Sequence, residues 1–298
     1  MQRSLIFSLR HKGISNAKRQ GFTLVELVTV IIILGILVLG VSSFLIFGTR
    51  IFIDSTSVEQ VMSQSRFAIE RMTRDIRNAV PNSIRVANGA SGASAWQCIE
   101  MMPITSSSSY ILAPIAPLPA SNTATVMQGS GAPLVKVDDV TLSLLIYPLS
   151  PADVYTSVTS TSGKLFKIDE VTDDSVTNVT TIKFTKSVQF SAMSPRQRYF
   201  GVSDAISYCF EGITSELSVL KRYSGYNFNH PNTQPSPTEM GTSVLMAENV
   251  VNTIRVNSPM VYTPGTLQNN AMVQLNPLFD IQGQSLQYHH QVQVINVP

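Results

Sequence analysis

A single carboxylate near the start of a membrane-length apolar run is the feature that most constrains this chain. The 24 residues from Leu24 to Phe47 are almost all apolar, and Glu26 is the only ionisable residue among them. As an α-helix this run rises about 36 Å, enough to cross a hydrocarbon core about 30 Å thick. An ionised side chain is costly in that core, so we expect Glu26 to lie at the membrane surface or to meet a cation elsewhere. A free α-amino group on Phe22 would be such a cation.

The segment before this run has the charge of a leader that stays in the cytoplasm. By the positive-inside rule, we expect everything after Phe47 to face the periplasm. A secretory signal peptide cleaved at Val41-Ser42-Ser43 and a plain signal anchor are the alternatives. Glu26 also suits the first turn of any helix, where an acid complements the macrodipole. Residues 1–21 contain no acid and five cations, Arg3, Arg10, Lys12, Lys18 and Arg19.

The junction after Gly21 is similar to a known processing signal. Lys18-Arg19-Gln20-Gly21 followed by Phe22-Thr23-Leu24-Val25-Glu26 resembles the class III prepilin signal of type IV pilins and type II secretion pseudopilins. The resemblance implies that prepilin peptidase cuts after Gly21 and N-methylates Phe22. It also implies that Glu26 pairs with the N-terminus of a neighbouring subunit. The implied partners are other minor and major pilins and an inner-membrane assembly platform.

Other segments are similar to one group within this family, the minor pilins of mannose-sensitive haemagglutinin (MSHA) pilus systems. The resemblance implies a non-enzymatic subunit of the inner membrane, with a periplasmic head, that helps to initiate or cap a pilus and enters it at the tip. Many major pilins have a proline about where Ser43 stands, and its absence favours a minor pilin or pseudopilin. The alternatives are a minor pseudopilin of type II secretion, a pilus-tip adhesin and a membrane-anchored periplasmic enzyme. The similar segments are 65–71 through 77–82, 96–100 and 292–298.

The apolar helix is predicted to continue past the membrane as an amphipathic helix. Apolar residues from Val58 recur at spacings of three and four, and Pro81 disfavours helical geometry at Val80. We therefore expect one helix over residues 22–80, of which 22–48 form the transmembrane part. Two ion pairs are expected on this helix, Glu70 with Arg74 and Arg71 with Asp75. They are interpreted as surface support for the helix rather than as a functional site. The expected apolar face contains Val58, Met62, Ser65, Ile69, Met72, Ile76, Ala79 and Val80, and the opposite charged face contains Arg66, Glu70, Arg71, Arg74, Asp75 and Arg77.

Residues 81–298 are predicted to form one β-rich head, which makes the fold class α+β. Short runs rich in β-branched and aromatic residues alternate there with segments rich in Gly, Ser and Pro. The expected loops are residues 87–94, 105–133 and 226–243. The expected strands are residues 95–99, 134–137, 140–147, 164–168, 181–185, 205–210, 217–223, 250–256, 272–275 and 286–294.

Cys98 and Cys209 are the two cysteines of the chain, and both follow the predicted membrane span. An oxidising compartment favours a disulfide between them, and two buried free thiols are the alternative. No CxxC motif is present, and the histidines offer no partner for a catalytic cysteine.

The remaining composition predicts neither a cofactor, a metal site nor a nucleic-acid partner. Without the leader, 16 Lys and Arg face 19 Asp and Glu, a side-chain charge of −3 that leaves no basic patch for phosphates. His289 and His290 would point to opposite faces of a strand, so they form no ready chelate. The acids in residues 169–174 lack the pattern of an EF-hand, which favours a solvated acidic loop over a calcium site.

Overall fold

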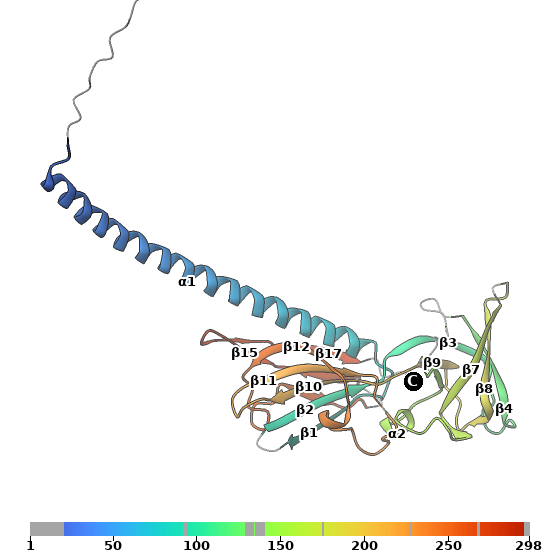
Figure 1. The fold of residues 1–298 in the computed structure, drawn as a ribbon. Coiled ribbons are helices and arrows are strands. Elements are labelled where there is room, and N and C mark those ends of the chain that lie inside the picture. The colour runs from blue at the N-terminus through green and yellow to red at the C-terminus, as the bar shows by residue number, and fades with distance from the viewer. Residues whose placement is uncertain are drawn as a thin grey trace, which may run out of the picture. The chain divides into compact units, whose positions relative to one another are not determined.

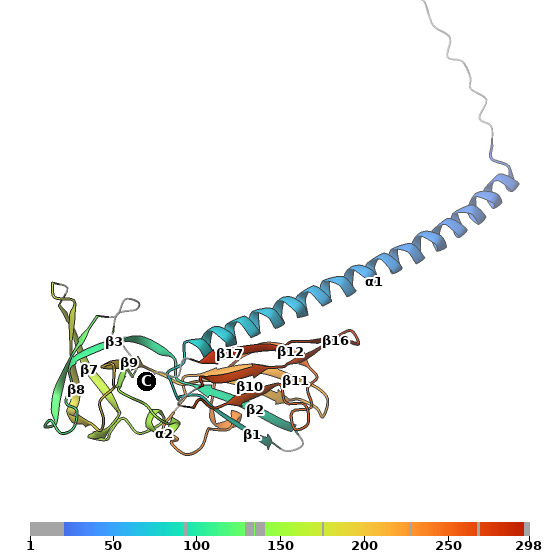
Figure 2. The same cartoon turned by 180° about the vertical axis from the view of Figure 1, so that it is seen from behind.

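The computed structural model describes residues 21–91, 94–128, 134, 141–174, 176–226, 228–266 and 269–294 (Figure 1 and Figure 2). The chain divides into two compact units, Met1–Ser55 and Thr56–Pro298. Helix α1, Leu24–Arg77, contributes to both units, and every strand that the structure describes belongs to the second. The predicted α+β class, a long N-terminal helix followed by a strand-rich head, is confirmed.

In the second unit, α1 packs along one face, close to the predicted one. Ala79 and Val80 are buried as expected, but the helix ends at Arg77, three residues earlier than Val80. The reason is a change of hydrogen-bond partners: the backbone N–H of Val80 donates to the carbonyl oxygen of Met102 at 2.8 Å, and Ala79 forms a bridge with Pro103. The buried helical residues are Ser65, Ala68, Ile69, Met72, Thr73 and Ile76.

The packed face of α1 shares one hydrophobic core with a seven-stranded sheet and a three-stranded sheet. Alternation along β2 divides its side chains, because Ile99 and Met101 join this core while Cys98 joins another. The larger sheet has the order β1 (Arg85–Ser91), β2 (Ser94–Met101), β10 (Ile206–Gly212), β11 (Ser218–Ser224), β12 (Ser243–Val250), β15 (Leu278–Ile281) and β16 (Gln284–Gln287). The smaller sheet has the order β13 (Met260–Thr263), β14 (Ala271–Leu275) and β17 (His290–Val294).

A second seven-stranded sheet closes on itself as a small barrel, because β4 pairs with both β3 and β8. Phe166, Phe184 and Phe190 fill its interior with edge-to-face contacts at centroid distances of 4.7–6.3 Å. Around the barrel run β4 (Ser121–Met127), β3 (Ile104–Leu112), β9 (Arg198–Val202), β5 (Ser143–Leu145), β7 (Leu165–Asp174) and β8 (Val179–Phe190), and β6 (Ser162–Gly163) pairs with β8. The short helices are α2 (Pro151–Val154) and η1 (Pro237–Glu239).

A third core joins the barrel to the first sheet. Leu165 and Phe200 from the barrel pack there with Cys98, Cys209 and Tyr223 from the first sheet. The barrel and the sheets therefore share buried apolar surface within the second unit.

Several predicted loops and strands are wrong. Residues 87–94 include most of β1, and residues 105–133 contain most of β3 and all of β4. Of residues 250–256, only Val250 lies in a strand, and residues 286–294 are divided between β16 and β17. Residues 169–174 belong to β7 rather than to a loop, although their acids are exposed as expected. The strand predicted over 134–137 lies, apart from Leu134, outside the described residues.

Candidate functional site

The N-terminal end of α1 carries the residues of the predicted processing junction. Gly21, Phe22 and Thr23 precede the helix, which begins at Leu24. Thr23 caps it, because its Oγ1 accepts a hydrogen bond from the backbone N–H of Glu26 at 3.3 Å. Glu26 lies in the first turn, where a negative charge complements the helix dipole. Within the described chain its carboxylate makes no ion pair or hydrogen bond, so it remains available to an external partner.

The apolar surface that follows is exposed. Every residue from Gly21 to Thr56 is exposed, and the best 18-residue window of α1 has a mean hydropathy of 3.0. A Cβ added at Gly35, Gly40 or Gly48 would meet no atom within 4 Å. This surface is thus long and apolar enough to cross a membrane, and its glycines leave room for the close approach of another helix.

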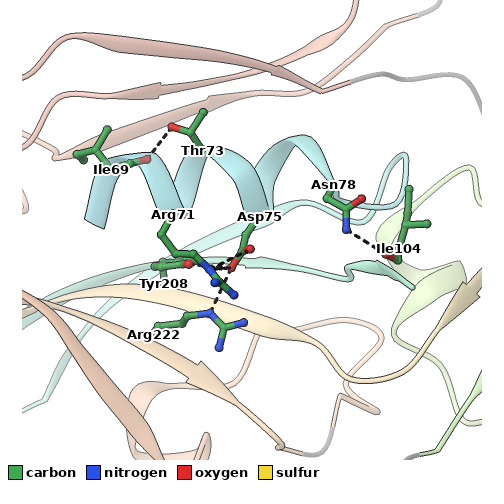
Figure 3. A network of polar contacts seen from close by, with 8 residues as sticks. All are labelled: Ile69, Arg71, Thr73, Asp75, Asn78, Ile104, Tyr208 and Arg222. Atoms are coloured by element: carbon green, nitrogen blue, oxygen red, sulfur yellow. Dashed lines mark hydrogen bonds and ion pairs between the residues drawn. The ribbon is translucent and has the colours of Figure 1, made fainter. Parts of the chain in front are cut away.

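In the second unit, Asp75 connects α1 to the first sheet (Figure 3). Its carboxylate accepts hydrogen bonds from the Tyr208 hydroxyl at 2.8 Å and from Nε of Arg222 at 3.2 Å. The expected ion pair with Arg71 is also present, with Nε and the carboxylate 3.4 Å apart. Burial, together with the neighbouring carboxylate of Asp75, raises the pKa of Tyr208 well above its usual value. The interpretation of Asp75 as surface support is therefore wrong: only 13% of its side chain is exposed, and it anchors the helix.

Further hydrogen bonds hold the end of α1. Asn78 donates from Nδ2 to the carbonyl oxygen of Ile104 at 3.0 Å and accepts at its own carbonyl from the Ile104 N–H at 2.9 Å (Figure 3). Between three and four turns earlier, the hydroxyls of Ser65 and Tyr288 are 2.9 Å apart. The last turns of the helix are therefore fixed by polar contacts as well as by the core.

Cys98 and Cys209 form a disulfide. They lie opposite each other on the neighbouring antiparallel strands β2 and β10, and both are fully buried. The bond closes a loop with a sequence separation of 111 residues. It is inaccessible in the folded head and supports structure rather than redox chemistry.

A buried ion pair that the sequence analysis did not find lies between the first sheet and α2. Glu100, fully buried, accepts hydrogen bonds from Nε of Arg85 and from the Tyr226 hydroxyl, the latter at 2.8 Å. Arg85 also donates to the His230 carbonyl and stacks over the Tyr155 ring, 3.8 Å from its centroid. Burial raises the pKa of Glu100, while the guanidinium of Arg85 opposes that shift. Because both charges are compensated within the fold, the cluster is structural.

The described residues include no group of three or more His, Cys, Asp or Glu side chains able to hold a metal ion. His289 precedes β17, and its Nδ1 lies 3.2 Å from Oδ1 of Asn276, while His290 begins the strand. In the predicted acidic loop, Glu170 pairs with Lys183, and Asp174 accepts a hydrogen bond from Thr177. These acids are partnered within the β7–β8 hairpin.

Comparison with known families places a processing motif at the N-terminal junction. Residues 16–42 match the family described as the prokaryotic N-terminal methylation motif. The match indicates a type IV pilin-like or pseudopilin precursor that prepilin peptidase cleaves, and proteins of this kind are structural. No curated protein and no solved structure gives a significant match to the chain.

Proposed function

We propose that this chain is a minor type IV pilin that helps to initiate or cap a pilus. Prepilin peptidase would cut between Gly21 and Phe22 and methylate the new N-terminus. The helix would anchor the subunit in the inner membrane with its head in the periplasm, and would later pack among the helices of a filament, at its tip. The protein would have no enzymatic activity of its own.

The observation that carries this proposal is the continuous exposed apolar surface of α1 directly after the methylation motif. Exposed apolar side chains are unfavourable in water, so this surface requires lipid or other helices. The helix continues without a break through Gly35, Gly40 and Ser43. An unbroken helix, with glycines that leave room for a neighbouring helix, is suited to a subunit that moves from a membrane into a bundle of similar helices.

Glu26 would direct the subunit to its position in the bundle. Its carboxylate has no partner in the described chain, and a neighbour's N-terminal amine is the cation that the motif supplies. A charge pair formed away from water contributes to the preference for one axial register, since a shift leaves both charges buried and unpaired.

The narrower assignment is to an MSHA-type minor pilin similar to MshO. It rests on residues 65–71 through 77–82, 96–100 and 292–298. A minor pseudopilin of a type II secretion system has the same helix and junction and is the second candidate, favoured by the same motif. The two differ in the machine that they serve, with an assembly platform and partner pilins in each case.

The first test examines processing. Mass analysis of the mature protein should find methylated Phe22 at the N-terminus. An N-terminus at Phe44, just after Val41-Ser42-Ser43, would reassign the segment as a secretory signal peptide.

The second test examines assembly. Glu26→Val should leave membrane insertion and cleavage largely intact and should reduce the number of surface pili. Glu59→Val, which changes another exposed acid of the same helix, is the matched control and should leave piliation normal. Normal piliation with Glu26→Val would remove the role of the carboxylate. A deletion strain with normal pili and defective protein secretion would transfer the assignment to the pseudopilin.

A further inference from the structure

A cleft of about 980 Å³ lies beside the last turns of α1, within the second unit. One wall is a stripe of charged helix residues, Arg66, Glu70, Arg74 and Arg77. The other wall comes from Tyr288 and the two residues that follow it. At about 100° per residue, the four stripe residues fall within about 80° of the helix circumference, so they face the same side.

The arginines of this cleft differ from Arg71, which pairs with Asp75 one turn further along the same helix. Arg66, Arg74 and Arg77 are exposed, and their side chains make no ion pair or hydrogen bond with the rest of the described chain. Glu70 is the one acid in the stripe, four residues from both Arg66 and Arg74. Asp75 also borders the cleft, but its carboxylate already binds Tyr208 and Arg222. The cleft therefore keeps an excess of positive charge that nothing in the described fold compensates.

We propose that this cleft binds an extended acidic peptide segment of a partner protein. From Arg66 to Arg77 the helix rises about 16 Å. A segment of six residues in extended conformation covers about the same length, and its alternate side chains point to one side. Along the helix the arginines lie at about 0, 12 and 16 Å and Glu70 lies at about 6 Å, so carboxylates at the two ends of such a segment, rather than at its middle, lie opposite the arginines.

The spread of the arginines favours a peptide over a small anion. Arg66 is about 12 Å along the helix from Arg74, so a single carboxylate or phosphate contacts only part of the stripe. A segment with several carboxylates contacts all three guanidinium groups, each of which can bind a carboxylate through two hydrogen bonds.

The test uses the full-length protein in detergent and fluorescently labelled hexaglutamate as the probe. Fluorescence anisotropy should show binding that weakens as salt is added. The triple variant Arg66→Ala, Arg74→Ala, Arg77→Ala should bind roughly tenfold more weakly, since each exposed charge pair contributes only modestly. The matched control, Lys186→Ala, Arg196→Ala, Arg255→Ala, removes the same charge from exposed residues outside the cleft and should bind like the wild type.

Three outcomes would overturn the proposal. The first is an absence of hexaglutamate binding to the wild type at low salt. The second is equal weakening in the cleft variant and the control, which would assign the binding to net charge. The third is full competition by free glutamate at a concentration equal to that of the hexaglutamate, which would identify a small-anion site. Unfolding by urea, followed through Trp96, checks that both triple variants are folded. This test is independent of cleavage and piliation, so its failure leaves the proposed function standing.

Discussion

Removal of the Asp75 carboxylate should weaken the attachment of α1 to the head. The carboxylate is 13% exposed, and it binds a fully buried Tyr208 and a 22% exposed Arg222. A hydrogen bond to a charged group contributes about 1.5–3 kcal/mol, and the partner left without it adds a desolvation penalty. The pair with Arg71, whose side chain is 41% exposed, adds only a few tenths of a kcal/mol. We therefore expect Asp75→Ala to lower the free energy of unfolding by about 2–4 kcal/mol.

Urea unfolding of the full-length protein in detergent measures this change. Trp96 is the single tryptophan, and it lies on β2, which pairs with the strand that carries Tyr208, so its fluorescence reports on the affected sheet. Glu70→Ala is the matched control on the same helix and should change the free energy by less than about 0.5 kcal/mol. Tyr208→Phe removes one of the hydrogen bonds and should give a loss between those of the two alanine variants. An Asp75→Ala midpoint equal to that of Glu70→Ala would refute the anchoring role.

Two further predictions concern the head. Replacement of both Cys98 and Cys209 by Ser should lower the free energy of unfolding of the head by up to about 4–5 kcal/mol, the chain-entropy value for a loop of this length. Urea unfolding measures this loss. Alkylation of both cysteines in the native wild type would contradict the disulfide. The second prediction concerns Asp153. Burial raises its pKa, but this effect is outweighed by hydrogen bonds from the backbone N–H groups of Leu149 and Ser150 and by the Lys164 ammonium. The pKa of Asp153 is therefore below its usual 3.8. The wild type should therefore be more stable than Asp153→Asn at neutral pH and should lose this advantage as the pH falls through the lowered pKa of Asp153. A stability difference between the two proteins that does not change with pH would contradict this.

The helix was predictable because its signals are local. The length of the apolar run, the three-four spacing after Val58 and the proline at position 81 are all properties of neighbouring residues. Its end was predicted less well, because the hydrogen bond that removes Val80 from the helix goes to Met102, on a segment that composition does not reveal. The sequence limits where a helix can end, while a distant partner decides the final turn.

The strands were less predictable because pairing decides them. Ser106, Ser107, Ser108 and Ser109 indicate a loop by composition, yet they form the middle of β3 and pair with β9. Residues 85–91 likewise form a strand because they pair with β2, with Arg85 opposite Glu100. Strand propensity depends on cross-strand neighbours, which a single sequence does not show.

The charged face of α1 shows what sequence reasoning missed and which signal was present. The predicted charged face combines two groups of residues that the structure separates. At about 100° per residue, Arg71 and Asp75 lie about 140–180° around the helix from Arg66, on the opposite flank of the buried face. That division was available from helical geometry alone. Geometry did not reveal the partners of Asp75, since Tyr208 and Arg222 are 133 and 147 residues away in the chain. One flank is therefore neutralised by the head, while the other, with Arg66, Arg74 and Arg77, keeps its charge for a partner outside the fold.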